Sequence, residues 1–239
     1  TARARPWQNG WRSESVSPAN QSPRRDERSD RQHIASPWLE NDERLGRVKT
    51  ILSLFDYSGN WPKPYLDAGY NVVQVDIKHG QDVLEIDAQW LLDHDLADVH
   101  GILAAPPCTD FAGSGAQYWP AKDADGRTAQ SVALIEQTMK IVDFCQPAWW
   151  VLENPVGRLN RWLGKPRMYF HPWEYGDAYT KKTALWGEFN EPVRTPVEPI
   201  RACAQGSWVQ KLGGKSERTK ELRSATPMGF ARAFFLANP

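Results

Sequence analysis

The sequence predicts an α/β fold in which a mostly parallel central sheet carries helices on both faces. Two short apolar runs, Val48 to Phe55 and Asn71 to Ile77, flank a segment of helical character. Two later apolar runs, Gly101 to Ala105 and Trp149 to Leu152, each end at polar residues and proline. Strands that alternate with helices are typical of a parallel sheet, because parallel neighbours need a long crossover connection.

The chain of 239 residues has room for one α/β domain and an additional segment. Residues 1–46 are rich in Arg, Ser, Pro, Gln and Asn and lack a sustained apolar period, so we expect a disordered N-terminal arm there and a folded domain over residues 47–239. Basic and acidic residues number 29 each, which gives a formal net charge of +0. Any affinity for nucleic acid must therefore come from a local patch.

The three cysteines, Cys108, Cys145 and Cys203, lack both the paired spacing of a zinc site and the density of a disulfide framework. We expect no metal and a reducing, cytoplasmic setting. The sequence shows no apolar run long enough to span a bilayer and no apolar signal core, so we expect no membrane association.

The first half of the domain has the features of a nucleoside site. A tight loop, Asp-Tyr-Ser-Gly-Asn, follows the first strand, and a short helix opened by prolines ends near Ala68 and Gly69. The second strand ends at Asp76, about 20 residues after the loop, a spacing that suits a carboxylate on ribose hydroxyls. The alternative role for Asp76 is a helix cap. The loop has one glycine, Gly59, where a dinucleotide fingerprint has three, so we favour a cofactor without a pyrophosphate.

The centre of the chain presents a cysteine. Helical spacing from Ile86 to Leu96 precedes the strand Gly101 to Ala105, which stops at two prolines. Prolines cannot extend the ladder, so Cys108 is expected on a stiff turn at the sheet edge where ligands bind in open α/β folds. The alternative is a buried structural thiol. Residues 111–125, rich in Gly, Ser and aromatic residues, are expected to form a flap, and a helix is expected from Ser131 to Cys145.

The strand Trp149 to Leu152 ends at Glu153, Asn154 and Pro155, so Glu153 and Cys108 are expected at the same edge of the sheet. Two strands are expected around a turn at Gly176 and Asp177, and a final helix after a cap at Ser224 or Thr226. Two basic runs follow the predicted site and favour either a nucleic-acid patch or a solvated surface: Arg158, Arg161, Lys165 and Arg167, then Lys211, Lys215, Arg218, Lys220 and Arg223.

From about Val48 onward, these motifs resemble the AdoMet-dependent cytosine-C5 DNA methyltransferases, in particular short forms typical of phages and prophages. Leu54 to Gly59 is similar to the family's first cofactor motif, Ala105-Pro106-Pro107-Cys108 to its Pro-Cys motif, and Leu152-Glu153-Asn154-Pro155 to its Glu-Asn motif. The resemblance implies a class I Rossmann-like methyltransferase domain over residues 47–239, without a separate target-recognition domain, and S-adenosyl-L-methionine as the cofactor.

The resemblance also implies roles for particular residues. Cys108 would be the nucleophile, Glu153 the acid at cytosine N3 and Asn154 the residue that orients the turn. Lys182 or Lys181 would replace the arginine that steadies the base and its phosphate. The implied cofactor contacts are Phe55, Ser58, Gly59, Asp76, Ile77, Asp82, Val83 and Pro106. The expected nucleic-acid contacts are Arg158, Arg161, Lys165, Lys181, Lys215 and Arg218.

Three departures from the family pattern leave alternatives open. Tyr57 stands where the family usually has a glycine, the Gln-x-Arg-x-Arg motif is absent, and the span from Gly187 to Ser224 is too short for the usual recognition domain. We expect a monomer that acts on DNA, either as a duplex with a flipped base or as a single strand, with a separate recognition partner as one option. The alternatives are C5 modification of free pyrimidine nucleotides and an inactive DNA-binding or partner-binding relic of the fold.

Overall fold

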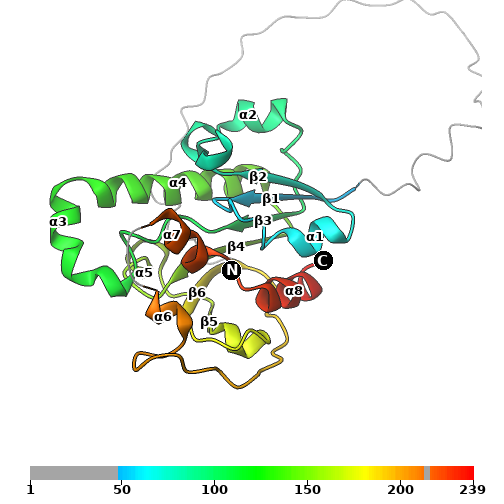
Figure 1. The fold of residues 1–239 in the computed structure, drawn as a ribbon. Helices are drawn as coiled ribbons and strands as arrows, with labels where there is room; N and C mark the ends of the chain where they lie inside the picture. Colours follow the sequence, from blue (N-terminus) through cyan, green and yellow to red (C-terminus); the bar gives the residue numbers. More distant parts are fainter. Residues whose placement is uncertain (1–47, 213–215) are drawn as a thin grey trace, which may run out of the picture. The chain divides into compact units, whose positions relative to one another are not determined.

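The computed structural model describes residues 48–212 and 216–239, which form the domain shown in Figure 1. The expectation of a disordered arm over residues 1–46 and the assignment of Lys215 to nucleic-acid binding lie outside the described residues.

A six-stranded sheet with the order β2-β1-β3-β4-β6-β5 forms the centre of the domain. Its strands are β1 (Thr50–Leu54), β2 (Asn71–Val75), β3 (Gly101–Ala104), β4 (Trp149–Pro155), β5 (Met168–Phe170) and β6 (Thr183–Glu188). The first four run parallel, whereas β6 is antiparallel to both β4 and β5. The predicted α/β class with a mostly parallel sheet is confirmed.

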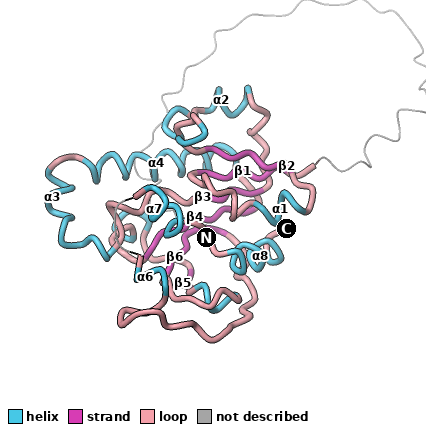
Figure 2. Tube along the Cα trace, viewed as in Figure 1, coloured by secondary structure: helices cyan, strands magenta, loops and turns pink. Residues whose placement is uncertain are grey.

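Helices lie on both faces of the sheet, as Figure 2 shows. They are α1 (Lys63–Asp67), α2 (Ala88–Asp93), α3 (Trp119–Ala124), α4 (Arg127–Cys145), α5 (Asn160–Leu163), α6 (Trp208–Lys211), α7 (Glu217–Ser224) and α8 (Met228–Ala237). Short 3₁₀ turns are η2 (Ile77–His79), η3 (Val83–Glu85), η4 (Gly113–Tyr118) and η5 (Pro172–Tyr175). The connection from β1 to β2 contains α1 and runs in one direction across the sheet, whereas the connection from β3 to β4 contains α4 and runs in the other. Since both are right-handed crossovers, α1 and α4 lie on opposite faces.

An aromatic core joins α1 and α8 to one face of the sheet. Trp61 and Tyr65 pack there with Phe230 and Phe234, against Trp149 of β4. The hydroxyl of Tyr65 donates to the carbonyl oxygen of Asn238 at 2.8 Å. Gly101 is paired with Trp149 across β3 and β4, and any side chain at Gly101 would overlap the Trp149 indole. Glycine is therefore required at the start of β3 for the tryptophan to lie flat on the sheet.

The structure differs from the sequence-based expectation in the C-terminal third. The final helix has Pro227 at its N-cap, and neither Ser224 nor Thr226 caps it, because Ser224 belongs to α7. Instead, Asp177 from the distant turn accepts a hydrogen bond from the Gly229 amide at 2.8 Å. A carboxylate there also faces the positive end of the helix dipole. The strand expected to run to Tyr175 ends at Phe170 and continues as η5.

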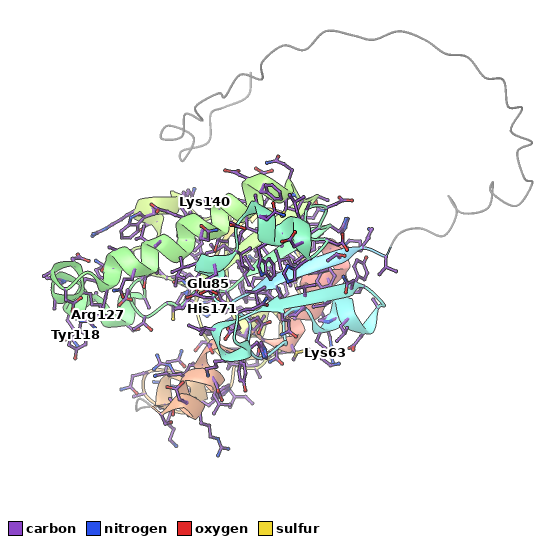
Figure 3. All side chains as sticks on the ribbon, turned by 90° about the horizontal axis from the view of Figure 1, so that it is seen from above. Lys63, Glu85, Tyr118, Arg127, Lys140 and His171 are labelled. Atoms are coloured by element: carbon purple, nitrogen blue, oxygen red, sulfur yellow. The ribbon has the colours of Figure 1, made fainter. Side chains whose placement is uncertain are left out.

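The segment expected to be a flap, residues 111–125, is regular in structure. It forms η4 and then α3, which packs against α4. Figure 3 shows Tyr118, the last residue of η4, near Arg127 at one end of the molecule. Lys122 of α3 is buried, so the segment is anchored to the domain rather than free over a site.

Candidate functional site

Cys108 and Glu153 lie at the carboxyl ends of neighbouring parallel strands. Cys108 follows β3 by four residues, and Glu153 lies within β4 beyond its pairing with β3. The side chain of Asn154 is fully buried and donates to the carbonyl oxygen of Pro106 at 3.0 Å. This bond ties the turn that carries Cys108 to the strand that carries Glu153, so the two groups share one rigid support.

The segments that follow these two residues are also joined to each other. The Arg158 amide donates to the Phe111 carbonyl at 2.9 Å, and the Gly113 amide donates to the Val156 carbonyl at 2.9 Å. Ala112 and Gly157 form an isolated antiparallel bridge between these bonds. The two loops after β3 and β4 therefore form a small ladder of their own, which fixes the backbone on both sides of the site.

We expect Gly157→Ala to separate the two loops and break the backbone hydrogen bonds between them. An added methyl group at Gly157 would overlap the Phe111 carbonyl oxygen, and the neighbouring backbone leaves it no room. Overpacking of this kind costs about 1–3 kcal/mol, which urea unfolding of the variant would measure. Gly115→Ala is the matched control, because a methyl group there meets its nearest atom, the Thr109 carbonyl oxygen, at 3.8 Å. Equal stability of the two variants would contradict the proposed tight contact.

The environment of Cys108 keeps its thiol protonated. Burial is the largest cause that raises the pKa of Cys108, and the Glu153 carboxylate raises it further. The ammonium of Lys181 and the guanidinium of Arg223 act in the opposite direction and lower the pKa of this thiol. The pKa of Cys108 thus depends on charged side chains from other segments, in contrast to Cys145, where burial alone raises the thiol pKa to about 11.

The pKa of the Glu153 carboxyl group is also raised above its usual value. Burial raises the pKa of Glu153, while Lys181 and the Thr183 hydroxyl lower it. The nearest approach of Lys181 Nζ to Glu153 Oε1 is 4.0 Å, and both side chains are largely buried. A carboxylic acid of raised pKa beside a cation can donate a proton or a strong hydrogen bond to a ring nitrogen.

Of the two adjacent lysines, Lys181 faces the site and Lys182 does not. Lys182 is exposed, and its ammonium lies over the ring of Tyr169 at 5.3 Å from the centroid. Of the two lysines named from the sequence, Lys181 is the one that approaches Glu153, and Lys182 lies against Tyr169 instead. The two lysines directly precede β6, which begins at Thr183, and adjacent side chains of an extended chain point in opposite directions.

Arg158 belongs to the scaffold of the site, which corrects its assignment to nucleic-acid binding. It is 3% exposed, and its guanidinium donates to the Asp110 carbonyl, the Thr128 hydroxyl and the Asp123 carboxylate at 2.7–2.9 Å. Asp110, two residues after Cys108, also accepts from the Ser131 hydroxyl and pairs with Lys122 at 3.1 Å. This buried network holds the Cys108 turn against α3 and α4.

The other predicted nucleic-acid contacts are exposed. Arg161 and Lys165 lie in and just after α5, and Arg218 lies in α7. Arg161 also stands over the ring of Trp119, at 5.8 Å from its centroid. These side chains are free to reach phosphates, whereas Arg158 is not.

Sequence reasoning did not connect two residues with the predicted reacting groups: Tyr179, which it did not single out, and Arg223, which it placed only in a basic run. Burial raises the pKa of Tyr179, and the charges of Asp177 and Glu153 raise it further, so its hydroxyl lies within the field of the Glu153 carboxylate. Arg223, in α7, is the cation that acts on Cys108 from the far side. Arg223 belongs to the second basic run, but the run itself does not link it to Cys108, and Tyr179 carries no sequence signal of its own.

The loop after β1 has the shape of a ligand cradle. Phe55 adopts a positive φ of 61°, which non-glycine residues rarely do, and Gly59 has a φ of 66°. The buried carboxylate of Asp56 organises the loop by accepting hydrogen bonds from the Ser58 hydroxyl and from the amides of Gly59 and Trp61. A strained residue held by such a network is a feature of binding loops.

The neighbouring strand end offers groups that fit a nucleoside. One carboxylate oxygen of Asp76 accepts from the Lys78 amide at 2.8 Å, and within the described residues its second oxygen has no hydrogen bond. Ile77 next to it is 72% exposed and Tyr57 is 46% exposed, so apolar surface is available for a purine ring. Asp82 caps η3 in the same way, Val83 is buried, and Pro106 is buried at the start of the Cys108 turn.

Helix α7 lies between these two halves of the site. Lys78, just after β2, pairs with Glu221 at 2.8 Å and with Glu217 at 3.6 Å, and its ammonium lies 4.8 Å from the Tyr57 ring centroid. The same helix carries Arg223 toward Cys108. The Lys78 pairs therefore join α7 to the nucleoside cradle, and the charge of Arg223 in the same helix lowers the pKa of the Cys108 thiol.

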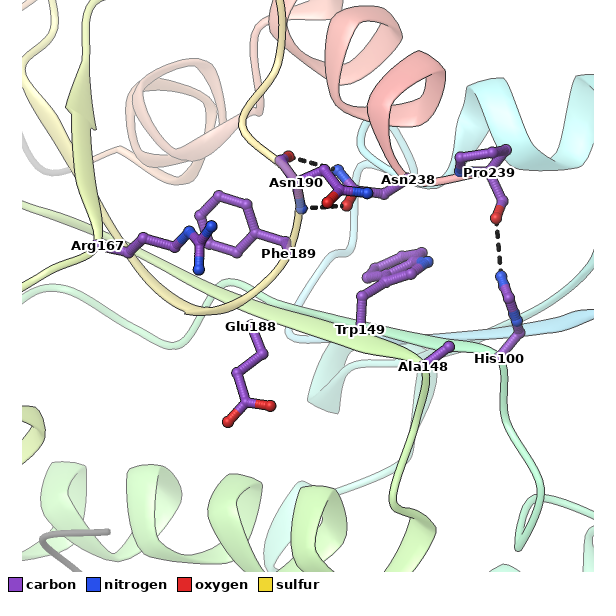
Figure 4. Close-up of a pocket in the computed structure, with 9 residues that line it drawn as sticks. All are labelled: His100, Ala148, Trp149, Arg167, Glu188, Phe189, Asn190, Asn238 and Pro239. Carbon is purple, nitrogen blue, oxygen red and sulfur yellow. Dashed lines mark hydrogen bonds between the residues drawn. The ribbon is translucent and has the colours of Figure 1, made fainter. Parts of the chain in front are cut away.

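A hollow of about 440 Å³ lies at the opposite edge of the sheet, near the starts of β3 and β4. Figure 4 shows Arg167 beside the ring of Phe189, and Asn190 hydrogen-bonded to Asn238. None of the predicted catalytic or cofactor residues lines this hollow.

Two observations concern the described residues as a whole. No helix among them has both the length and the apolar character to cross a bilayer. In residues 48–212 and 216–239, no group of three or more His, Cys, Asp or Glu side chains is arranged to hold a metal ion.

No family model matches the chain, and no curated protein is significantly similar to it. Among solved structures, the chain is similar to a candidate DNA modification methyltransferase encoded within a prophage of E. coli, with a TM-score of 0.43 and 15% sequence identity. The match covers 71% of this chain and 56% of that one, so the chain spans a little over half the length of the similar structure. The chemistry assigned to the site therefore rests on the residues described above.

Proposed function

We propose that this chain transfers a methyl group from S-adenosylmethionine to C5 of cytosine in DNA through a covalent adduct with Cys108. The observation that carries the proposal is the placement of Cys108 and Glu153 at the ends of two neighbouring parallel strands, joined by the bond from Asn154 to the Pro106 carbonyl. A thiol and a carboxylic acid on one rigid support can act on two positions of one pyrimidine ring.

Cys108 would activate the ring as a nucleophile. C5 of cytosine is too weak a nucleophile to accept a methyl group unaided. The Cys108 thiol would therefore first release its proton to solvent, and the resulting Sγ thiolate would add to C6 and move an electron pair to C5. That pair forms the new bond to the methyl group. A base then removes the C5 proton, the C5–C6 double bond forms again, and the Sγ–C6 bond breaks to return the thiolate.

Glu153 would assist the addition from the other side of the ring. As Sγ adds to C6, negative charge develops at N3, and a proton or strong hydrogen bond there stabilises it. Burial raises the pKa of Glu153, which keeps a proton available. Lys181, at 4.0 Å from the carboxyl group, would stabilise the carboxylate that remains after the proton has moved.

The cradle after β1 and β2 would hold the cofactor, whose sulfonium supplies an electrophilic methyl group. The fit rests on three features: the Asp76 oxygen that accepts no hydrogen bond within residues 48–212 and 216–239, for a ribose hydroxyl; exposed Ile77, for the adenine; and the Gly59 loop. Tyr57, which replaces the expected glycine, points to solvent and lies beside Lys78 and the ring of His79, so it adds a surface to the cradle instead of filling it.

A target base inside a duplex cannot reach this thiol, so the cytosine must be flipped out or lie in a single strand. Exposed cations around the site, Arg161, Lys165 and Arg218, would contact phosphates. Such contacts make affinity fall steeply with salt concentration.

Covalent trapping tests the proposal. The protein is incubated with S-adenosylmethionine and DNA that contains 5-fluorocytosine, whose fluorine cannot leave as a proton does. We expect a denaturation-resistant complex whose mass equals protein plus DNA plus one methyl group. The Cys108→Ala variant should form none, while Cys145→Ala, which removes the buried thiol away from the site, should form it normally.

The other outcomes identify the alternatives. An adduct with 5-fluoro-deoxycytidine monophosphate in place of DNA would move the assignment to free nucleotides. Binding of S-adenosylmethionine or DNA without an adduct would indicate an inactive relic of the fold and overturn the proposal.

A further inference from the structure

Two aromatic side chains at the rim of the site form a surface that the proposed chemistry does not use. Trp208, in α6, is 40% exposed, and its ring centroid lies 5.2 Å from that of Tyr179 at an interplanar angle of 54°. A large indole left open to solvent beside a reaction centre suits a flat ligand. We propose that Trp208, supported by Tyr179, is the stacking site for an unpaired nucleotide next to the target cytosine.

The position of Trp208 is fixed by bonds to the loop that precedes β6. The Ser207 hydroxyl, almost fully buried, accepts from the Thr180 amide at 2.8 Å. Gln210, in the same short helix, donates from its side chain to the Thr180 carbonyl at 2.6 Å. The indole is therefore held as a rigid platform, and little conformational entropy is lost when a base stacks on it.

The platform is adjacent to the reacting groups. Tyr179 carries the indole, and the next residue, Thr180, bonds through its amide to Ser207 at 2.8 Å. Lys181, two residues after Tyr179, approaches Glu153 at 4.0 Å. The short segment from Tyr179 to Lys181 therefore joins the Trp208 platform to Glu153.

The charges around the platform favour a nucleic acid over other flat ligands. Lys211 ends α6 and is exposed, and Lys165 is exposed after α5, which lies at the same end of the sheet as α6 in Figure 1. Aromatic side chains interleaved with cations are the usual means by which proteins bind single-stranded DNA, because every base has a face that can stack. This subsite rests on the proposed function, since it places the ligand relative to the target cytosine.

The test compares Trp208→Ala with Trp90→Ala. Trp90 is a matched control because it stacks on His94 in the short helix α2, at a ring distance of 3.9 Å and away from the site. Binding of a labelled single-stranded oligonucleotide with one central cytosine is measured without S-adenosylmethionine, so that no reaction occurs. We expect Trp208→Ala to weaken binding about 5- to 150-fold, Trp208→Phe to retain most affinity, and Trp90→Ala to bind as the parent chain does.

A second oligonucleotide, with abasic sites on both sides of the cytosine, identifies the contact. It removes the stacking base, so the parent chain and Trp208→Ala should bind it equally. An unchanged affinity of Trp208→Ala for the intact strand, or an equal loss on both strands, would overturn the stacking site. The proposed function is tested separately, by the 5-fluorocytosine adduct. If the parent chain binds DNA in a Trp208-dependent way but forms no adduct, the stacking site stands and the methyl-transfer assignment is wrong.

Discussion

Replacing Glu153 with glutamine is expected to remove most methyl transfer while making Cys108 more reactive toward a small alkylating reagent. The first effect follows from the loss of the acid at N3, for which general acid catalysis contributes about 10²- to 10⁴-fold. The second follows from charge. The Glu153 carboxylate raises the pKa of Cys108, and glutamine carries no such charge.

The two readouts are the rate of tritiated methyl incorporation into DNA and the pH profile of iodoacetamide labelling at Cys108. We expect the labelling profile of Glu153→Gln to move to lower pH. Glu136→Gln, on the exposed side of α4, is the control and should leave both readouts unchanged. A variant that loses both activities together would show that Glu153 supports the fold of the site, and would contradict the role of acid.

The same variant should be more stable than the parent chain at neutral pH. Burial raises the pKa of Glu153 in the folded state above its usual 4.5, so the native protein binds this proton more tightly than the unfolded chain does. The stabilisation is complete below pH 4.5 and is lost as the pH rises through the folded-state value. Glutamine carries no such charge, so the stability difference between Glu153→Gln and the parent chain should grow as the pH rises. Each kcal/mol of that difference would raise the Tm of the variant by about 2–4 °C relative to the parent, which thermal unfolding at several pH values would measure.

Replacing Arg158 with methionine is expected to produce the largest loss of stability. Its guanidinium holds the Asp110 carbonyl, Thr128 and Asp123, and the change leaves these acceptors without their donor. Breaking a buried ion pair costs about 3–5 kcal/mol, and the lower end applies because Asp123 is half exposed. At about 3 kcal/mol, we expect Tm to fall by about 6–12 °C.

Arg161→Met is the matched control, since Arg161 lies three residues further along and is exposed. It should leave Tm within about 1–2 °C and reduce the salt dependence of DNA binding by about one phosphate contact. A stable Arg158→Met variant with weakened DNA binding would return Arg158 to the phosphate contacts and contradict its scaffold role.

Much of the fold could be predicted from local patterns. Buried apolar runs identified the parallel strands, and Pro106 and Pro107 correctly predicted the end of β3 before Cys108. The cap of α8 could not be predicted, because Asp177 reaches Gly229 from a turn 52 residues away. Ser224 and Thr226 are good caps by type, but tertiary contacts override such local preferences.

The candidate site was predictable in its two reacting groups but not in the residues around them. Arg158 and Arg161 look alike in sequence, yet one is buried by the network around Asp110 and the other faces solvent. Which of Lys181 and Lys182 points toward Glu153 depends on where β6 begins, because adjacent residues of an extended chain point in opposite directions. Sequence patterns do not locate the start of a strand to within one residue. Tyr179 precedes β6 by four residues, and the antiparallel pairing of β6 with β4 brings this segment toward the strand that carries Glu153.

The aromatic core described above has a consequence for how the domain is made in the cell. Phe230 and Phe234 of α8 fill the space between α1 and the sheet, and the Tyr65 hydroxyl bonds to Asn238 across 173 residues. The first strands cannot bury their faces until α8 is present. Contacts so distant along the chain slow folding, and a nascent chain on the ribosome keeps this surface open throughout translation. We therefore expect folding to be completed after synthesis of α8, with chaperone protection needed until then.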